Sequence, residues 1–131
     1  MTIRPFVRAI LVLPAAGLLG FGGMAFASPG AGLTAAFGNT VKARYPDGRI
    51  QRYWFKADGT WDAIGRRGKP SSGKWTAKGE QVCLKQTKPF AAPFKYCTTF
   101  PDHGAPGASW AAKSAGGDPI QLSVTKGVER P

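Results

Sequence analysis

The chain has 131 residues, with 18 Lys and Arg against 7 Asp and Glu, and a formal net charge of +11. This length favours one domain over two. The 18 Gly and 11 Pro argue against a helical bundle. One His and two Cys supply too few ligands for a catalytic zinc site.

Residues 1–27 have the pattern of a secretory signal peptide. Arg4 and Arg8 give a positive start, an apolar run covers 9–26, and Ala-Phe-Ala at 25–27 fits a cleavage site. The alternative is an uncleaved anchor, because the apolar run is barely long enough to span a bilayer. Cleavage predicts a periplasmic or secreted bacterial protein that begins at Ser28 and has no stable membrane span.

Export also predicts the state of the two cysteines. Exported proteins keep disulfides, so Cys83 and Cys97 are expected to form one. The bond would close a loop of about 15 residues and stabilise the domain by roughly 3 kcal/mol.

Turn signals divide the rest of the chain into short segments. They are Pro-Asp-Gly at 46–48, Ala-Asp-Gly at 57–59, Lys-Gly-Glu at 78–80 and Gly-Gly-Asp at 116–118. The segments between them predict eight short strands, at 41–45, 50–56, 60–64, 73–77, 81–86, 94–100, 108–112 and 119–125. We therefore expect an all-β fold, an antiparallel meander that closes into a barrel or a small sandwich.

The strand pattern also sets the expected boundaries. Residues 28–39 are expected to be a flexible N-terminal segment with at most one helical turn, at 33–37. The barrel domain is expected over 40–126, followed by a C-terminal tail over 127–131.

Alternation along the strands assigns side chains to faces. The expected inward residues are Val41, Ala43, Tyr45, Tyr53, Phe55, Val82, Leu84, Phe94, Tyr96, Thr98 and Phe100. Cys83 and Cys97 then point outward from neighbouring strands, which is the arrangement that a cross-strand disulfide needs.

Three tryptophans follow glycines just inside a strand. Gly59-Thr60-Trp61 and Gly73-Lys74-Trp75 share a G-x-W pattern, and Trp110 follows a looser version of it. One interpretation is a ring of large side chains that plugs one end of the barrel. The other is an aromatic ligand pocket in the barrel mouth.

Basic residues are the main candidate for function. On the first hairpin, four cations are expected to surround an outward Trp54, and a cationic loop follows the third strand. An exposed surface of this kind suits an acidic protein or an anionic envelope component, although it also fits an ordinary basic surface. The candidate residues are Lys42, Arg44, Arg52, Trp54, Lys56, Arg66, Arg67 and Lys69.

Catalytic patterns are scarce. Asp102 and His103 are neighbours, but they lie in a Pro/Gly-rich loop and no serine stands in a nucleophile-elbow pattern. Several acids belong to turns, where they bond their own backbone, and no phosphate-binding glycine loop leads into a helix. We therefore expect no enzyme activity and no cofactor or metal.

The segment from Thr40 to Cys97 resembles small exported bacterial proteins, mostly uncharacterised. The shared motifs are Tyr-Pro-Asp-Gly at 45–48, an aromatic strand at 52–55, Ala-Asp-Gly-Thr at 57–60, Gly-Lys-Trp at 73–75, Cys83-Leu84 and Cys97. Its layout is more distantly similar to periplasmic protease-inhibitor and lipocalin-like barrels. The resemblance implies fold and compartment rather than activity, because its motifs are turn chemistry.

The expected function is a non-catalytic, monomeric binding module of the cell envelope, with no specific affinity for nucleic acid. The alternatives are a lipocalin-like carrier of a small apolar ligand and a small hydrolase. A filled barrel interior would favour surface binding over carriage, whereas His103 clustered with two acids would favour the hydrolase.

Overall fold

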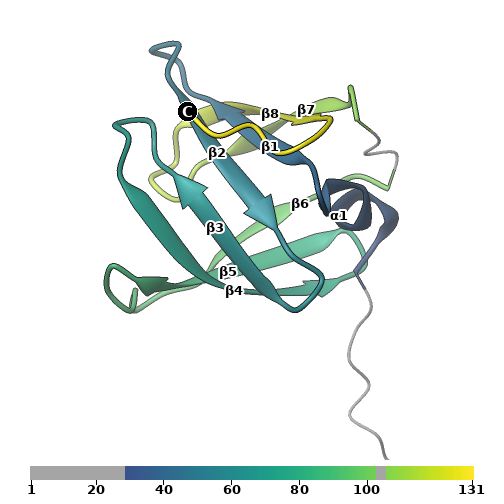
Figure 1. Ribbon diagram of the computed structural model, residues 1–131, viewed down its shortest axis with the longest axis horizontal. Helices are drawn as coiled ribbons and strands as arrows, with labels where there is room; N and C mark the ends of the chain where they lie inside the picture. The colour runs from purple at the N-terminus through teal and green to yellow at the C-terminus, as the bar shows by residue number, and fades with distance from the viewer. Residues whose placement is uncertain (1–28, 103–105) are drawn as a thin grey trace, which may run out of the picture.

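The computed structural model describes residues 29–102 and 106–131 (Figure 1). The predicted signal peptide and His103 lie outside these ranges. Eight antiparallel strands form one sheet with the order β6-β5-β4-β3-β2-β1-β8-β7. The strands are β1 Thr40–Arg44, β2 Ile50–Phe55, β3 Thr60–Ile64, β4 Pro70–Lys78, β5 Gln81–Lys88, β6 Tyr96–Thr99, β7 Ser109–Lys113 and β8 Pro119–Thr125.

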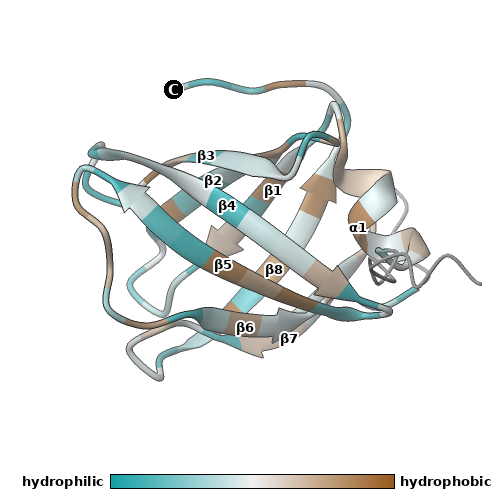
Figure 2. Cartoon of the chain, turned by 90° about the horizontal axis from the view of Figure 1, so that it is seen from below, coloured by the Kyte–Doolittle hydropathy of each residue, from teal (hydrophilic) through white to brown (hydrophobic). Residues whose placement is uncertain are grey.

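The sheet curls into a nearly closed barrel. Strand β1 pairs with both β2 and β8, and the two edge strands, β6 and β7, come side by side to complete the wall (Figure 2). Across this seam, Trp110 Nε1 donates a hydrogen bond of 3.0 Å to the Thr99 carbonyl, and the Tyr96 hydroxyl donates to the Lys113 carbonyl. The prediction of an all-β antiparallel barrel is therefore confirmed.

The hairpin turns form for local reasons. Asp47 accepts a hydrogen bond from the Arg49 N–H at 2.9 Å, and Asp58 accepts from the N–H and the hydroxyl of Thr60 at 3.0 and 2.6 Å. Gly48 and Gly59 take the positive φ that these turns require. The Asp-Gly pairs thus stop one strand and start the next in the places that the sequence predicts.

The two G-x-W motifs need glycine for different reasons. Gly59 has a φ of +90°, whereas Gly73 lies where β4 meets β5 so closely that a Cβ would be 2.0 Å from the Lys85 carbonyl oxygen. A bulge between Ser72 and Gly73 marks the same place in the β4–β5 pairing. Close backbone approach is a common role of glycine inside a strand.

Inward side chains fill the barrel. The core residues from the strands and the segment after β6 are Val41, Ala43, Phe55, Trp61, Ala63, Ala77, Val82, Leu84, Phe100, Ile120, Leu122 and Val124. The rings of Phe55 and Phe100 meet edge to face with their centroids 5.5 Å apart. The prediction that Phe94 points inward from a strand is wrong: β6 begins at Tyr96, and Phe94 lies in the preceding loop with 60% of its surface exposed.

A short helix covers one end of the barrel. Helix α1, Ala31–Ala36, buries Leu33 and Ala36 completely, and the Gly30 N–H donates to the Gly79 carbonyl at 2.8 Å. Gly32 sits so close to the Pro101 carbonyl oxygen that a Cβ would be 2.2 Å from it. Residues 31–36, which overlap the one helical turn expected at 33–37, thus pack as an end plug (Figure 2).

Cys83 and Cys97 are bonded to each other. They are direct cross-strand partners on β5 and β6, with their Cα atoms 4.0 Å apart, so the predicted disulfide is present. Both side chains lie on the outer side of the barrel wall, as the alternation predicts. Among the helices that the structure describes, none is long and apolar enough to cross a membrane.

Candidate functional site

The outer face of the first hairpin brings the predicted cations together. Lys42 on β1 lies directly opposite Arg52 on β2, and Trp54 on β2 lies opposite Asp62 on β3. Trp54 points away from the barrel core, as predicted, because it belongs to the outward set of its strand. Strand alternation thus gives the correct face for these residues.

The expectation that Trp54 faces water is wrong. Only 4% of its surface is exposed, because the chain after β8 folds back over the hairpin (Figure 1). The Arg130 guanidinium lies 4.3 Å from the centroid of the Trp54 ring. Trp54 Nε1 donates to the buried Thr40 hydroxyl at 3.1 Å, so the indole has both a cover and a polar partner.

The cations of this face also have acidic neighbours, which the sequence analysis did not foresee. Lys42 Nζ lies 2.6 Å from a carboxylate oxygen of Glu129, and Lys56 Nζ lies 3.0 Å from Asp62. Arg52 Nε is buried and has no hydrogen-bond partner within 29–102 and 106–131. Carboxylates from the tail and from β3 therefore pair with two of the cations, and the tail covers the indole of Trp54. These groups, which the alternation predicts to be exposed, are the reason to predict a binding surface here. A contact role for this face stays a prediction.

The remaining predicted cations lie towards the end opposite α1. Arg66 of the β3–β4 turn lies over the ring of Tyr45, with its guanidinium carbon 4.1 Å from the ring centroid. Its Nη1 lies 3.9 Å from a carboxylate oxygen of Asp47. Arg44, Arg67 and Lys69 are exposed. The eight predicted residues thus divide into a covered hairpin face and a group on or near the turns at the open end.

The two tryptophans of the G-x-W motifs divide between the two predicted roles, a plug at one end of the barrel and an aromatic pocket. Trp75 packs against Phe37 beside α1, with 5.7 Å between ring centroids, and its Nε1 donates to the Lys56 carbonyl. Trp61 is buried and its Nε1 donates to the Lys74 carbonyl at 3.1 Å, but one side of its ring lines a pocket. One tryptophan therefore belongs to the plug and the other to a pocket.

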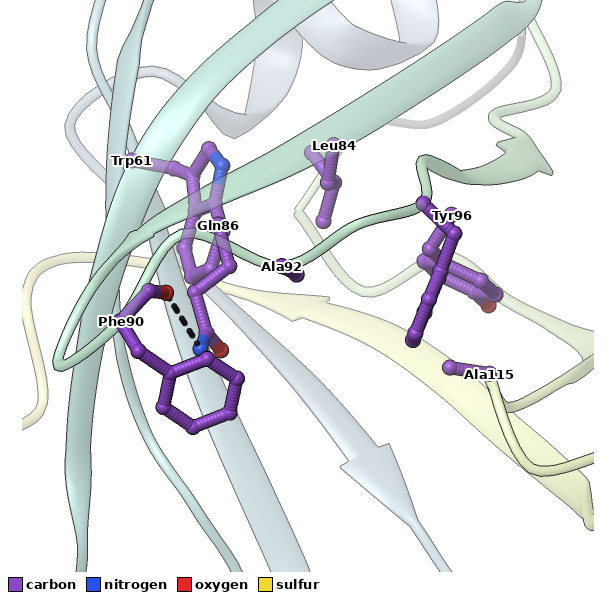
Figure 3. A pocket seen from close by; sticks show the side chains of 8 residues that line it. Trp61, Leu84, Gln86, Phe90, Ala92, Tyr96 and Ala115 are labelled. Atoms are coloured by element: carbon purple, nitrogen blue, oxygen red, sulfur yellow. Dashed lines mark hydrogen bonds between the residues drawn. The ribbon is translucent and has the colours of Figure 1, made fainter.

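The pocket opens at the end of the barrel opposite α1. We call it the mouth pocket, and it has a volume of about 240 Å³. Figure 3 shows Trp61 and Phe90 on one side, Leu84 and Ala92 behind, and Tyr96 with Ala115 on the other side. The eight lining residues are Trp61, Leu84, Gln86, Phe90, Ala92, Phe94, Tyr96 and Ala115.

Phe90 and Phe94 are the site residues that the sequence analysis missed. Phe90 is 64% exposed and Phe94 is 60% exposed, which is unusual for side chains of this size. Both belong to the β5–β6 loop, where the sequence reads Lys-Pro-Phe-Ala-Ala-Pro-Phe-Lys over 88–95. The sequence does carry a signal for these two residues: two phenylalanines lie in a proline-containing loop between lysines. A loop has no core-facing side that would bury them, so they are expected to be exposed.

The β5–β6 loop is held against its own strand. Gln86 Nε2 donates to the Phe90 carbonyl at 3.2 Å (dashed in Figure 3), and the Ala92 N–H donates to the Gln86 carbonyl at 3.1 Å. The Lys85 ammonium donates to the Ala92 carbonyl. Three hydrogen bonds therefore present the two phenylalanines at the edge of the pocket.

The interior beyond the mouth pocket is almost filled. A second void of about 20 Å³ shares Leu84 and Tyr96 with the mouth pocket and is otherwise enclosed by core side chains. A void of this size has room for about one water molecule. The barrel therefore offers a shallow opening and no deep chamber.

Lysines frame the mouth pocket, although Asp118 lies nearby in the β7–β8 turn, where its carboxylate is 3.4 Å from the Ser114 hydroxyl. No Asp or Glu lines the mouth pocket, and Lys85, Lys88 and Lys95 belong to β5 and the loop that frame it. Burial raises the pKa values of Tyr45 and Tyr96, so both phenols near this end are neutral at physiological pH. The mouth thus combines an apolar floor with a cationic surround.

Among the residues that the structure describes, no group of catalytic side chains suggested by the sequence is brought together. Asp102 is exposed, and its N–H donates to a carboxylate oxygen of Glu80 at 3.3 Å, while His103 lies outside the described residues. Within 29–102 and 106–131, no three His, Cys, Asp or Glu side chains gather closely enough to hold a metal ion.

Fold and site together define a small, disulfide-bonded antiparallel barrel with one plugged end and one open, apolar mouth. No family model matches the chain, and comparisons with curated proteins and with solved structures likewise give no match. The resemblance to small exported bacterial barrels stays a prediction.

Proposed function

We propose that this protein is an exported, non-catalytic binding module whose binding site is the mouth pocket. The observation that carries the proposal is the pair of exposed phenylalanines, Phe90 and Phe94, at the rim of an apolar pocket. Exposed apolar side chains gathered around a concavity are typical of interaction sites.

The chemistry of the site selects an apolar group carried by an anionic partner. The pocket floor is formed by Trp61, Leu84 and Ala92, which offer contact area and few polar groups. Lys88 and Lys95 stand at the two ends of the loop that carries the phenylalanines. These lysines attract anionic ligands and increase the rate at which such ligands associate with the protein. Salt weakens both effects by screening the charges.

The pocket geometry argues against deep carriage of a small ligand. Drug-sized ligands occupy pockets of about 300–1,000 Å³ and are mostly buried, whereas the mouth pocket holds about 240 Å³ and leads only to a void of about 20 Å³. The site suits the insertion of one apolar group from a larger partner. We therefore place the lipocalin-like alternative second.

The site can be tested with anilinonaphthalene sulfonate, a fluorescent probe that is both apolar and anionic. We expect saturable binding to the folded protein that weakens at high salt, and a loss of at least tenfold in affinity for a Phe90→Ser, Phe94→Ser double variant. Val128→Ser is the matched control, because Val128 is 56% exposed and lies in the C-terminal tail. Equal binding by the double variant and the wild type would remove the mouth pocket as the site.

Capture from an envelope extract of the source organism then tests the function itself. Wild type and Val128→Ser should retain the same components, and the double variant should lose them. Components retained equally by all three proteins would contradict a role for the mouth. Circular dichroism of each variant checks that its fold is intact.

A further inference from the structure

The mouth end of the barrel combines two exposed aromatic rings with cations on several turns. We infer that the partner is the surface of an anionic phospholipid bilayer, which the protein meets mouth first, with Phe90 and Phe94 inserted among the lipids and the basic residues of the mouth turns on the headgroups. This inference rests on the proposed function and deepens it by naming the class of partner.

The connections around the mouth carry more cations than acids. Alternate connections of an antiparallel barrel lie at the same end, so the mouth is surrounded by the β1–β2, β3–β4, β5–β6 and β7–β8 connections. The acids of these connections are Asp47 and Asp118. The exposed cations of the same connections and of the strand ends beside them are Arg44, Arg49, Arg66, Arg67, Lys69, Lys88, Lys95 and Lys113.

The plugged end is balanced by comparison. In its connections and the strand ends beside them, the described charges are the cations Lys56, Lys78 and Lys126 and the acids Asp58, Glu80 and Asp102. The excess of positive charge at the mouth therefore has no counterpart among the described residues at the other end. A molecule with this distribution turns its mouth towards an anionic surface.

Most cations of the mouth end are available to such a surface. Asp47 is shared by two arginines, with Arg49 Nε and Arg66 Nη1 each 3.9 Å from one carboxylate oxygen. The exposed cations of this end that form no ion pair within 29–102 and 106–131 are Arg44, Arg67, Lys69, Lys88, Lys95 and Lys113. An extended anionic surface can contact cations on several turns at once, whereas one apolar group inserted by a protein partner lies beside few of them.

Phe90 and Phe94 supply the apolar part of the contact. They are 64% and 60% exposed, and Figure 2 shows their loop, between β5 and β6, at the end opposite α1. Exposed aromatic rings flanked by lysines suit the membrane interface, where the rings enter the acyl boundary and the ammonium groups stay with the headgroups. Both rings line the mouth pocket, so a bilayer that receives them also faces the pocket and offers it an acyl chain.

Flotation with lipid vesicles tests the partner. We expect the wild type to bind vesicles of equimolar phosphatidylcholine and phosphatidylglycerol, and to bind vesicles of phosphatidylcholine alone at least roughly tenfold more weakly. Salt should weaken binding to the anionic vesicles by screening the charges. The Phe90→Ser, Phe94→Ser variant should also lose roughly tenfold in affinity for them, because interfacial binding increases with the apolar area that is buried.

Two charge variants show which end meets the bilayer. Lys88→Gln with Lys95→Gln removes two cations of the mouth, and the matched control, Lys78→Gln with Lys126→Gln, removes two exposed cations of the plugged end. Lys78 pairs with Gln81 at the start of β5, and Lys88 ends this strand of 8 residues. At about 3.3 Å per residue, the two ends are farther apart than the roughly 8 Å over which physiological salt screens charge. We therefore expect roughly tenfold weaker vesicle binding for the mouth variant and a change within about twofold for the control.

A tryptophan in the loop reports insertion directly. Bromine atoms on acyl chains quench the fluorescence of tryptophans that enter the bilayer, so vesicles of brominated anionic phospholipid should quench a Phe94→Trp variant more strongly than the wild type. Val128→Trp is the control, because Val128 is 56% exposed and precedes Glu129, which bonds Thr40 at the start of β1, away from the mouth. It should be quenched no more than the wild type. Circular dichroism checks that each variant is folded.

The outcomes separate this inference from the proposed function. Equal loss of vesicle affinity in the two lysine variants would overturn the mouth-first contact, and so would quenching of Phe94→Trp no stronger than that of the wild type. Binding of anilinonaphthalene sulfonate in the mouth without binding to anionic vesicles would overturn the lipid surface and leave the proposed function standing. Capture of an acidic protein by the mouth, again without binding to vesicles, would do the same. Absence of probe binding by the wild type would remove the mouth pocket as a site, and the proposed function with it.

Discussion

At the residue scale, one buried hydroxyl joins three parts of the chain. The Thr40 side chain is fully buried, accepts from Trp54 Nε1 at 3.1 Å and from the Glu129 N–H at 2.8 Å, and donates to the Gly127 carbonyl at 2.8 Å. Strand β1, strand β2 and the tail therefore meet at a single oxygen atom. A threonine at the first position of a strand gives no sequence signal of such a role.

Thr40→Val should destabilise the fold more than its small change in side-chain size suggests. The substitution keeps the shape but leaves the Trp54 and Glu129 N–H groups without a buried acceptor, so we expect the free energy of unfolding to fall by about 2–3 kcal/mol. Urea denaturation measures the change. Thr76→Val, on the exposed side of β4, is the control and should stay within about 0.5 kcal/mol of the wild type. Equal stability of the two variants would show that the Thr40 network contributes little.

The tyrosines give a second prediction at this scale. Burial raises the pKa of all three, Tyr45, Tyr53 and Tyr96, above the ordinary value of 10.0. The unfolded chain loses these protons near pH 10 and the folded chain retains them. The stability contribution is therefore complete below pH 10 and falls as the pH rises above it.

The absorbance of phenolate tests this directly. In the folded protein each tyrosine should titrate at a higher pH than in urea, because burial raises its pKa. Tyr53→Phe should lose less stability than the wild type between neutral pH and pH 11, because Tyr53 is the strongest case of burial. A tyrosine that titrates at the same pH in the folded protein as in urea would contradict its raised pKa.

At the scale of elements, the parts that the sequence predicts well are those with local causes. Asp58 and Gly59 form their turn through local contacts within a few residues. The ends of the strands on either side of this turn can therefore be predicted from the local sequence. The hairpin faces follow from alternation alone. The cover over Trp54 does not, because it depends on Arg130 arriving from a segment 76 positions later in the chain, and helix α1 depends on the space that the barrel leaves at its end.

The candidate site was predicted less well for the same reason. Strand alternation correctly predicts one face for the cations of the first hairpin, but the carboxylates that pair with them, Asp62 and Glu129, come from other segments. The predicted strand limits put Phe94 inside a strand and leave Phe90 between strands, so they give the two residues no shared role. Only the fold shows that β5, β6 and the β7–β8 turn surround one pocket.

The disulfide acts on one element, the edge strand β6. Cys97 ties this four-residue strand to β5. A Cys83→Ser, Cys97→Ser variant should lose up to about 3 kcal/mol of unfolding free energy. Wild type treated with reductant should unfold at the same urea concentration as the variant, and the variant should not respond to reductant. A wild type as stable reduced as oxidised would contradict this contribution.

At the scale of the whole molecule, the barrel has two different ends. One end is closed by α1 and by Trp75 with Phe37, and the other carries the mouth pocket. Cationic turns and the β5–β6 loop belong to the open end. The residues of the mouth pocket are therefore held in place, because they lie against the packed core and beside the disulfide-linked strand β6.

Export is the prediction that concerns the whole chain. We expect N-terminal sequencing of the protein from its own cell envelope to begin at Ser28, because residues 25–27 form a small-x-small site after an apolar run. A variant with Ala25→Leu and Ala27→Leu should keep the leader and run larger on a gel. A wild-type protein that retains Met1 would instead be an anchored form.

The plugged end is also the end at which the described chain begins. Pro29 bridges to Gly79 in the β4–β5 turn, and Gly30 bonds the same turn, so the polypeptide enters the barrel from the side opposite the mouth. Anything attached ahead of residue 29, whether a membrane tether, a surface-coupling tag or a fused domain, therefore presents the mouth outward. Immobilisation through the N-terminus should leave the site open, whereas a tag on Pro131 would lie one residue from Arg130, which covers Trp54.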